Sequence, residues 1–167
     1  MLLHGWPEFW YTWRKNIPVL AGEFDVVVPD LRGFGDTHKP GLPDPPKKLL
    51  DDFVEDLRAL AESLGFERFG VVSHNVGAYV AQGFARKYPE RLSGLFFFNC
   101  PPELPKIGTP TRVRWGDSVL KVEWADRLGD YFADLDFSPM REAGHFAHYE
   151  RPDLANREIS DFFGSLV

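Results

Sequence analysis

The residue best placed for chemistry is Asn75, at a sharp turn between an apolar run and a run of small residues. Residues 66–72 predict a buried strand, and residues 79–88 predict a helix that Pro89 ends. A strand that turns at once into a helix holds the side chain at the turn above the sheet, in front of a helix N-terminus. This is the geometry of a nucleophile elbow. Its apex here is an amide, which has no charge with which to attack an electrophile.

Strand and helix patterns alternate around this turn, which indicates an α/β fold with a parallel sheet and helices on both faces. We expect strands at 1–3, 24–30, 66–72, 92–99, 111–115 and 137–142, and helices at 9–20, 50–64, 79–88, 122–132 and 153–163. In such sheets the chemistry lies at the carboxyl ends of the strands. The polar residues that follow those ends are His4, Asp30, Asn75, Asn99, Asp117 and His145.

The composition predicts a single domain over residues 1–167, since 44% hydrophobic residues suit one packed core. A net charge of −6 gives no basic surface for nucleic acid, and no apolar run has the roughly 20 residues of a membrane span. The one cysteine, Cys100, excludes an internal disulfide. No signal peptide is visible, so a cytoplasmic location is expected by default. No metal or other cofactor is expected, because His4, His74 and His145 lie on separate loops without ligand spacing.

Five short motifs follow one another across almost the whole chain. They are residues 4–8, 32–37 with Pro40, 73–78, 115–117, and 144–146 with Glu150 and Pro152. In this set and order the chain resembles the α/β-hydrolase fold and, within it, the epoxide hydrolase and haloalkane dehalogenase branch, with epoxide hydrolases the nearer. The ordered set is far more specific than any single motif. The resemblance implies an α/β-hydrolase core with a mostly parallel sheet and helices on both faces.

The resemblance implies a role for each part of the site. In this branch an aspartate at the position of Asn75 opens an epoxide, or displaces a halide, and leaves an alkyl ester on the enzyme. His145 matches the histidine that activates water for ester hydrolysis, and Asp117 matches the acid that orients this histidine. The backbone N–H groups of Trp6 and Val76 match the oxyanion hole.

The resemblance also implies an apolar, aromatic pocket for a small apolar substrate such as an epoxide. The residues expected to line it are Phe9, Trp10, Phe34 and His74. His74 and His4 are also expected to support the two halves of the oxyanion hole. His38 and His148 are expected on the surface. A second acid position of the family falls on Asn99, which is again an amide.

Two departures from the family pattern bear directly on the site. Asn75 replaces the aspartate, which leaves three readings open: an inactivated form that traps substrate or ester, a natural homologue without catalysis, or slow self-activation in which water held by His145 converts Asn75 to Asp. The family's helical cap belongs between Asn99 and Thr111, where only about ten residues stand, too few for a covering helix hairpin. We expect the cap to be missing near 100–110. The open pocket would then be covered by further residues, by a second copy of the chain in a homo-oligomer, or by a collapsed loop.

The start of the chain and the acid loop also depart from the family pattern. The chain begins at what matches the family's third strand, so the first two strands are expected to be missing and the strand at 24–29 to form an exposed sheet edge. The segment 116–120 is shorter than the acid loop of the family. From these gaps we expect an incomplete chain, in which the family's missing segments were either removed or left out of the sequence.

Other functions remain open beside epoxide hydrolysis. Haloalkane dehalogenases place a tryptophan directly after the nucleophile, and fluoroacetate dehalogenases an arginine, whereas Val76 offers neither. Trp6 stands where many haloalkane dehalogenases have a halide-binding asparagine. A non-catalytic binding protein of the same fold is favoured by Asn75 and the missing cap, and disfavoured by the motif around His145. A serine esterase is disfavoured because residue 75 is not serine.

Overall fold

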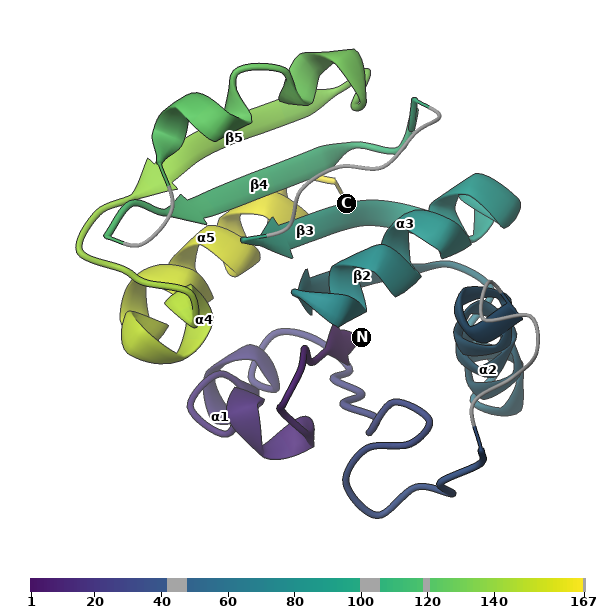
Figure 1. The fold of residues 1–167 in the computed structure, drawn as a ribbon. Helices are drawn as coiled ribbons and strands as arrows, with labels where there is room; N and C mark the ends of the chain where they lie inside the picture. The colour runs from purple at the N-terminus through teal and green to yellow at the C-terminus, as the bar shows by residue number, and fades with distance from the viewer. Residues whose placement is uncertain (42–47, 100–105, 119–120, 167) are drawn as a thin grey trace.

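The computed structural model describes residues 1–41, 48–99, 106–118 and 121–166, and contains a five-stranded parallel sheet (Figure 1). The strands lie side by side in chain order: β1 (Leu2–Leu3), β2 (Phe69–His74), β3 (Leu92–Phe98), β4 (Thr111–Gly116) and β5 (Leu135–Met140). Pairs such as Leu3 with Ser73 and Phe97 with Val113 define the register. The α/β fold and its parallel sheet are confirmed.

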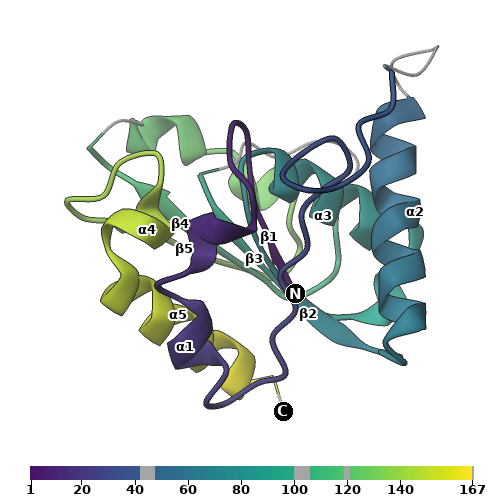
Figure 2. The same ribbon diagram turned by 90° about the horizontal axis from the view of Figure 1, so that it is seen from below.

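Helices cover both faces of the sheet, as expected. They are α1 (Ile17–Leu20), α2 (Lys48–Ser63), α3 (Val76–Lys87), α4 (Ala147–Glu150) and α5 (Pro152–Gly164). Figure 2 shows α2 and α3 on one side of the sheet and α1, α4 and α5 on the other. Because all the strands run in the same direction, their carboxyl ends meet at one edge, where polar side chains from distant parts of the chain can meet.

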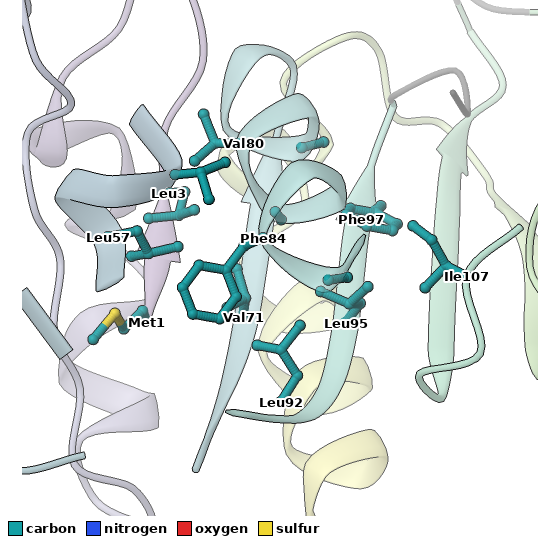
Figure 3. Close-up of a cluster of buried hydrophobic side chains, with 14 of the residues drawn as sticks. Met1, Leu3, Leu57, Val71, Val80, Phe84, Leu92, Leu95, Phe97 and Ile107 are labelled. Atoms are coloured by element: carbon teal, nitrogen blue, oxygen red, sulfur yellow. The ribbon is translucent and has the colours of Figure 1, made fainter. Parts of the chain in front are cut away.

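The strands are apolar on both faces because both faces are covered. In β3, Leu95 and Phe97 belong to the core on the side of α2 and α3, whereas Phe96 and Phe98 belong to the core on the side of α5. Figure 3 shows the first of these cores, with Phe84 of α3 packed over the sheet. These five side chains are at most 1% exposed. Burying each one contributes roughly 1.5–3 kcal/mol, so the sheet is a firm platform for the loops at its edge.

The strand predicted at 24–30 is wrong. These residues run beside β1 without forming a regular strand, with one backbone hydrogen bond from Leu2 N to Val27 O. β1 is only two residues long, so it offers few partners for a ladder. Pro29 also has no N–H to donate. The edge strand expected at 24–29 is therefore absent from the described structure.

The helix predicted at 9–20 is broken into two short pieces. A 3₁₀ helix at Trp10–Trp13 is followed by α1, which begins after Asn16. The buried amide of Asn16 donates to His148 O at 3.3 Å and to Asn156 Oδ1 at 2.7 Å. These long-range bonds hold Asn16 in the turn that separates the two helical pieces, and periodicity alone does not reveal them.

Other expectations concern the second half of the chain. The helix predicted at 122–132 is replaced by 3₁₀ helices at Val122–Ala125 and Leu128–Asp130. The position expected for the missing cap, 100–110, falls largely outside the described residues, so that expectation stays a prediction.

No helix in the described ranges is long and apolar enough to cross a membrane.

Candidate active site

Asn75 lies where β2 turns into α3, as the sequence predicts. Its backbone has φ 49° and ψ −115°, and asparagine tolerates a positive φ better than most residues. The start of α3 lies tight against β1, because a Cβ on Gly77 would come within 2.6 Å of the carbonyl oxygen of Leu3. Only glycine fits at that contact. The side chain of Asn75 caps α3, with Val76 N donating to its Oδ1 at 2.8 Å.

The two N–H groups expected to form an oxyanion hole converge on one atom. Trp6 N, in the loop after β1, donates to Asn75 Oδ1 at 3.1 Å. Val76 N, in the first turn of α3, donates to the same oxygen. Two donors at a helix N-terminus stabilise negative charge on the oxygen that they share. The amide oxygen of Asn75 therefore lies where a carboxylate oxygen or an oxyanion would be held.

His145 reaches the same point from the loop between β5 and α4. Its Nε2 lies 3.4 Å from Asn75 Nδ2, so the structure brings together the residues assigned as nucleophile position and base. Burial and the nearby ring of His74 lower the pKa of His145 below the ordinary 6.5. The charges of Glu8 and Glu150 oppose this shift. A neutral imidazole can take a proton from water, as a general base must.

Asp117 is not brought to His145 in the way expected of an orienting acid. It is exposed at the end of β4, and its Oδ1 accepts a hydrogen bond from Glu142 N at 3.0 Å. Within the part of the chain that the structure describes, no hydrogen bond joins Asp117 to His145. Its role as the acid stays a prediction that no direct contact supports.

Other side chains hold the loop of His145, and the sequence analysis did not assign them this task. Asn99 donates from Nδ2 to the carbonyl oxygens of Gly144 and His145, at 2.9 and 2.8 Å. Its Oδ1 accepts from Gly116 N at 2.7 Å. Glu150 accepts from the N–H groups on either side of His145, at 2.6 and 3.0 Å. The amide of Asn99, at the end of β3, therefore holds the end of β4 and the loop of the base together by three hydrogen bonds.

A buried polar cluster lies below the site and was also missed. Glu8 Oε2 lies 2.7 Å from His74 Nδ1. Thr12 Oγ1 donates to Glu8 Oε1 and lies 3.0 Å from His148 Nε2. Burial by itself raises the pKa of Glu8, but hydrogen bonds from His74 and Thr12 outweigh burial, and the pKa falls to about 2. The sequence did contain a signal for Glu8, because Glu8 is the last residue of the motif at 4–8, which also contains Trp6.

The expectation that His148 lies on the surface is wrong. Its side chain is 0% exposed, and its ring lies 4.2 Å from the ring of Trp13, between centroids. Burial lowers the pKa of His148 well below 6.5. The reason is the short helix α4, which the sequence analysis did not predict and which turns this side chain inward.

One group among the described residues has the spacing of metal ligands. One ligand atom from each of Glu8, His74 and His148 lies within 4.8 Å of the others. The ring of His74 and the carboxylate of Glu8 already share a hydrogen bond, so a metal ion would have to displace a proton from it. His148 Nδ1 has no hydrogen-bond partner in the described structure. As it stands the cluster is a hydrogen-bonded network of protein groups.

His4 supports the oxyanion loop from below. Its buried ring donates from Nδ1 to Gly5 O at 2.8 Å and accepts at Nε2 from Leu31 N at 2.9 Å. His74, which was expected in the pocket wall, is also fully buried and so lies beneath the surface of the site. His38 is exposed, as expected.

The aromatic residues expected to cover Asn75 are largely open to solvent. Trp6 is 64% exposed, Phe9 44% and Trp10 40%. Phe34 is half-buried. A cavity of about 340 Å³ lies elsewhere, at the amino ends of β2 and β3, opposite the edge that holds Asn75. The described residues therefore present an exposed apolar patch beside the site, of a kind that usually marks a binding surface.

Sequence comparisons agree with this geometry. A sequence model described as the alpha/beta hydrolase fold matches residues 1–134. The chain is 42% identical over 108 residues to a soluble epoxide hydrolase of Corynebacterium sp. (strain C12), covering 65% of this chain and 36% of that protein. It is 38% identical over 167 residues to epoxide hydrolase 3 of Siraitia grosvenorii, covering 95% of this chain and 52% of that protein. It is 37% identical over 103 residues to a fluoroacetate dehalogenase of Burkholderia sp, covering 61% and 34%. The chain thus matches between 34% and 52% of the length of these relatives.

Solved structures share the fold. The epoxide hydrolase CorEH without ligand superposes with a TM-score of 0.84 at 20% identity, covering 99% of this chain and 91% of that one. A thermophilic esterase from Thermogutta terrifontis gives a TM-score of 0.86 at 21% identity, covering 99% and 89%. At this identity the likeness shows the fold alone, and the two structures carry different activities in their names.

Proposed function

The chain belongs to the α/β-hydrolase fold family, and from that premise we propose a hydrolase of the epoxide hydrolase type in which Asn75 disables the first chemical step. The proposed substrate is a small apolar epoxide, which suits the aromatic patch and the named activity of the relatives. One observation carries the proposal. The N–H groups of Trp6 and Val76 share the side-chain oxygen of residue 75, and His145 lies 3.4 Å from its nitrogen.

An aspartate at position 75 would complete the chemistry. Its carboxylate would attack a carbon of the epoxide; the ring C–O bond would break, the ring oxygen would take up a proton from solvent, and an alkyl ester would form on the enzyme. His145 would then take a proton from water, and the resulting hydroxide would add to the ester carbonyl. The N–H groups of Trp6 and Val76 would hold the oxyanion until its C–O bond to the product breaks; the proton on His145 would pass to the leaving oxygen, which gives the diol, and the carboxyl group would lose its proton to solvent.

The Asn75→Asp variant tests this proposal directly. We expect diol release from small alkyl and aryl epoxides to rise on the order of 10³-fold or more over the unsubstituted chain, since losing a nucleophile costs at least this much in other hydrolases. Asn75→Ala is the matched control and should stay at background. If Asn75→Asp gains nothing, the alternative of a non-catalytic binding protein is favoured. A competent rate from a sample whose mass still shows Asn at position 75 would overturn the mechanism.

The position of the amide favours a second route to activity. The oxygen of Asn75 already accepts from two N–H donors, as the carbonyl of an amide substrate would, and His145 faces its nitrogen. Water activated by His145 would add to Cγ, and ammonia would leave, so that Asn75 becomes aspartate. Incubated protein should then gain the mass difference between amide and acid, with diol release rising in proportion. A His145→Gln variant should do neither. A constant mass during long incubation would rule this route out.

A dehalogenase is the weaker alternative. The side chain of Val76 offers no donor for a halide ion, although a fluoroacetate dehalogenase is among the relatives. Halide release by the Asn75→Asp variant from haloalkanes and from fluoroacetate, compared with diol release from epoxides, separates these reactions. Faster halide release than diol release would reverse the assignment.

A further inference from the structure

Glu8 and His74 form a buried pair that the proposed mechanism does not use. The side chain of Glu8 is 8% exposed and that of His74 0%. Glu8 Oε2 lies 2.7 Å from His74 Nδ1, and His74 Nε2 lies 2.8 Å from the backbone carbonyl oxygen of His145. The pair therefore links a residue in the loop after β1 to the loop of the base, 137 positions later in the sequence (8 to 145).

The partners of His74 determine its charge. The carboxylate of Glu8 is ionised, because its pKa is about 2. A carboxylate and a backbone carbonyl are both acceptors, so each ring nitrogen of His74 must donate. A histidine that donates from both nitrogens is an imidazolium. Glu8 and His74 are thus a buried ion pair, and each of its members satisfies further polar groups, as buried charges require.

The same pair also holds the other two parts of the site. Glu8 Oε2 accepts from Gly5 N at 2.8 Å, which fixes the loop that presents Trp6 N. His74 directly precedes Asn75 at the end of β2. The packing here is tight, because a Cβ on Gly5 would come within 2.5 Å of Asn75 Cβ and 3.0 Å of His74 Nδ1. The carboxylate of Glu8 therefore bonds the loop that presents Trp6 N directly, and through His74 it also holds the nucleophile position and the loop of the base.

We propose that Glu8 and His74 are the positioning pair of His145: Glu8 fixes the ring of His74, and that ring holds the backbone of the base. This proposal rests on the proposed function, in which His145 activates water. It assigns to Glu8 the orienting task that the sequence analysis gave to Asp117. Asp117 is exposed and accepts from Glu142 N, whereas Glu8 reaches His145 through two short hydrogen bonds.

The first test needs no catalysis and uses the unsubstituted chain. Proton NMR of protein with ¹⁵N-labelled histidine should show two slowly exchanging ring N–H protons for His74, because both are buried and hydrogen-bonded. In Glu8→Gln only one ring N–H should remain on His74, since the ring is then neutral and keeps one proton. Glu55→Gln, a glutamate on α2 whose partners are Lys87, Arg58 and Tyr88, is the matched control. A single ring N–H on His74 in the unsubstituted chain overturns the proposal, whatever the variants do.

The second test separates the two chemical steps in the Asn75→Asp background. With a misplaced base, ester formation should proceed while ester hydrolysis slows by roughly tenfold or more, so Glu8→Gln should accumulate alkyl-enzyme that intact-mass spectrometry detects. Glu55→Gln should not accumulate it. If Asp117→Asn accumulates the ester and Glu8→Gln does not, Asp117 is the orienting acid and the proposal is wrong. If Asn75→Asp itself forms no ester, the proposed function fails, and the NMR result still decides whether the pair exists.

Discussion

Asn75 and Asn99 are the same residue in nearly the same backbone setting, yet their surroundings are opposite. Each follows a strand of the parallel sheet, and each has φ 49°. Around Asn75 the oxygen meets two N–H donors, and the nitrogen faces a histidine ring. Around Asn99 the nitrogen meets two carbonyl oxygens, and the oxygen meets one N–H.

The difference shows which position can carry an acid. A carboxylate at 75 would accept from the same two N–H groups and would face His145, with a helix N-terminus behind it. A carboxylate at 99 would face two carbonyl oxygens, and neither side could donate. The surroundings of Asn99 therefore do not suit an acid at this position. An amide is the side chain that satisfies all three of its partners.

The largest expected effect comes from placing an aspartate at each position. Asn99→Asp should lower the free energy of unfolding by about 3 kcal/mol at neutral pH, because it buries a charge of which one oxygen keeps the N–H of Gly116 while the other faces two carbonyl oxygens. Asn75→Asp should change it by less than about 1 kcal/mol, because the donors remain satisfied. Urea denaturation measures both values. The loss at 99 should shrink as pH falls, since a protonated carboxyl regains a donor. Equal losses at both positions would remove the contrast drawn here.

The second prediction concerns Glu8→Gln. Glu8 holds the loop that presents Trp6 N, one of the two donors to Asn75. The pKa of Glu8 is about 2 in the folded protein, below the ordinary 4.5. The carboxylate therefore contributes stability that is present above about pH 4.5 and is lost as pH falls toward 2. We expect Glu8→Gln to lower the free energy of unfolding by about 2 kcal/mol at pH 7. Urea denaturation across this range should show the two proteins converging at low pH. A difference that does not depend on pH would mean that Glu8 acts by packing alone.

Glycine tolerates the positive φ equally well at both positions, and at position 75 it should give the smallest effect of all. Asn99→Gly should cost about 2 kcal/mol, because it leaves the carbonyl of Gly144 and the N–H of Gly116 without partners, while the carbonyl of His145 keeps its bond from His74. Asn75→Gly should cost only a few tenths of a kcal/mol, because glycine is an acceptable N-cap. Thermal or urea unfolding of the two variants measures the difference, and a larger loss at 75 than at 99 would contradict it.

The sequence by itself predicted the α/β class, the parallel sheet, the elbow at Asn75 and the N–H donors of Trp6 and Val76. The class, the sheet and the elbow depend on short-range information, whereas the N–H donors follow from the resemblance of the ordered motifs to the α/β-hydrolase fold. Hydrophobic runs indicate buried strands, small residues at 77 and 78 permit the tight turn, and an ordered set of motifs places Asn75 and His145 at the same edge of the sheet.

Only the tertiary structure decided the state of the polar groups beneath that edge. Asn99, Glu8 and His148 have partners that lie 17 to 136 positions away in the sequence, at distances set by how loops and strands pack. Nothing in the spacing of residues 24–30 shows that β1 offers too few partners for a ladder. A buried polar side chain takes its role from the donors and acceptors that the fold brings to it, and local sequence does not contain those partners.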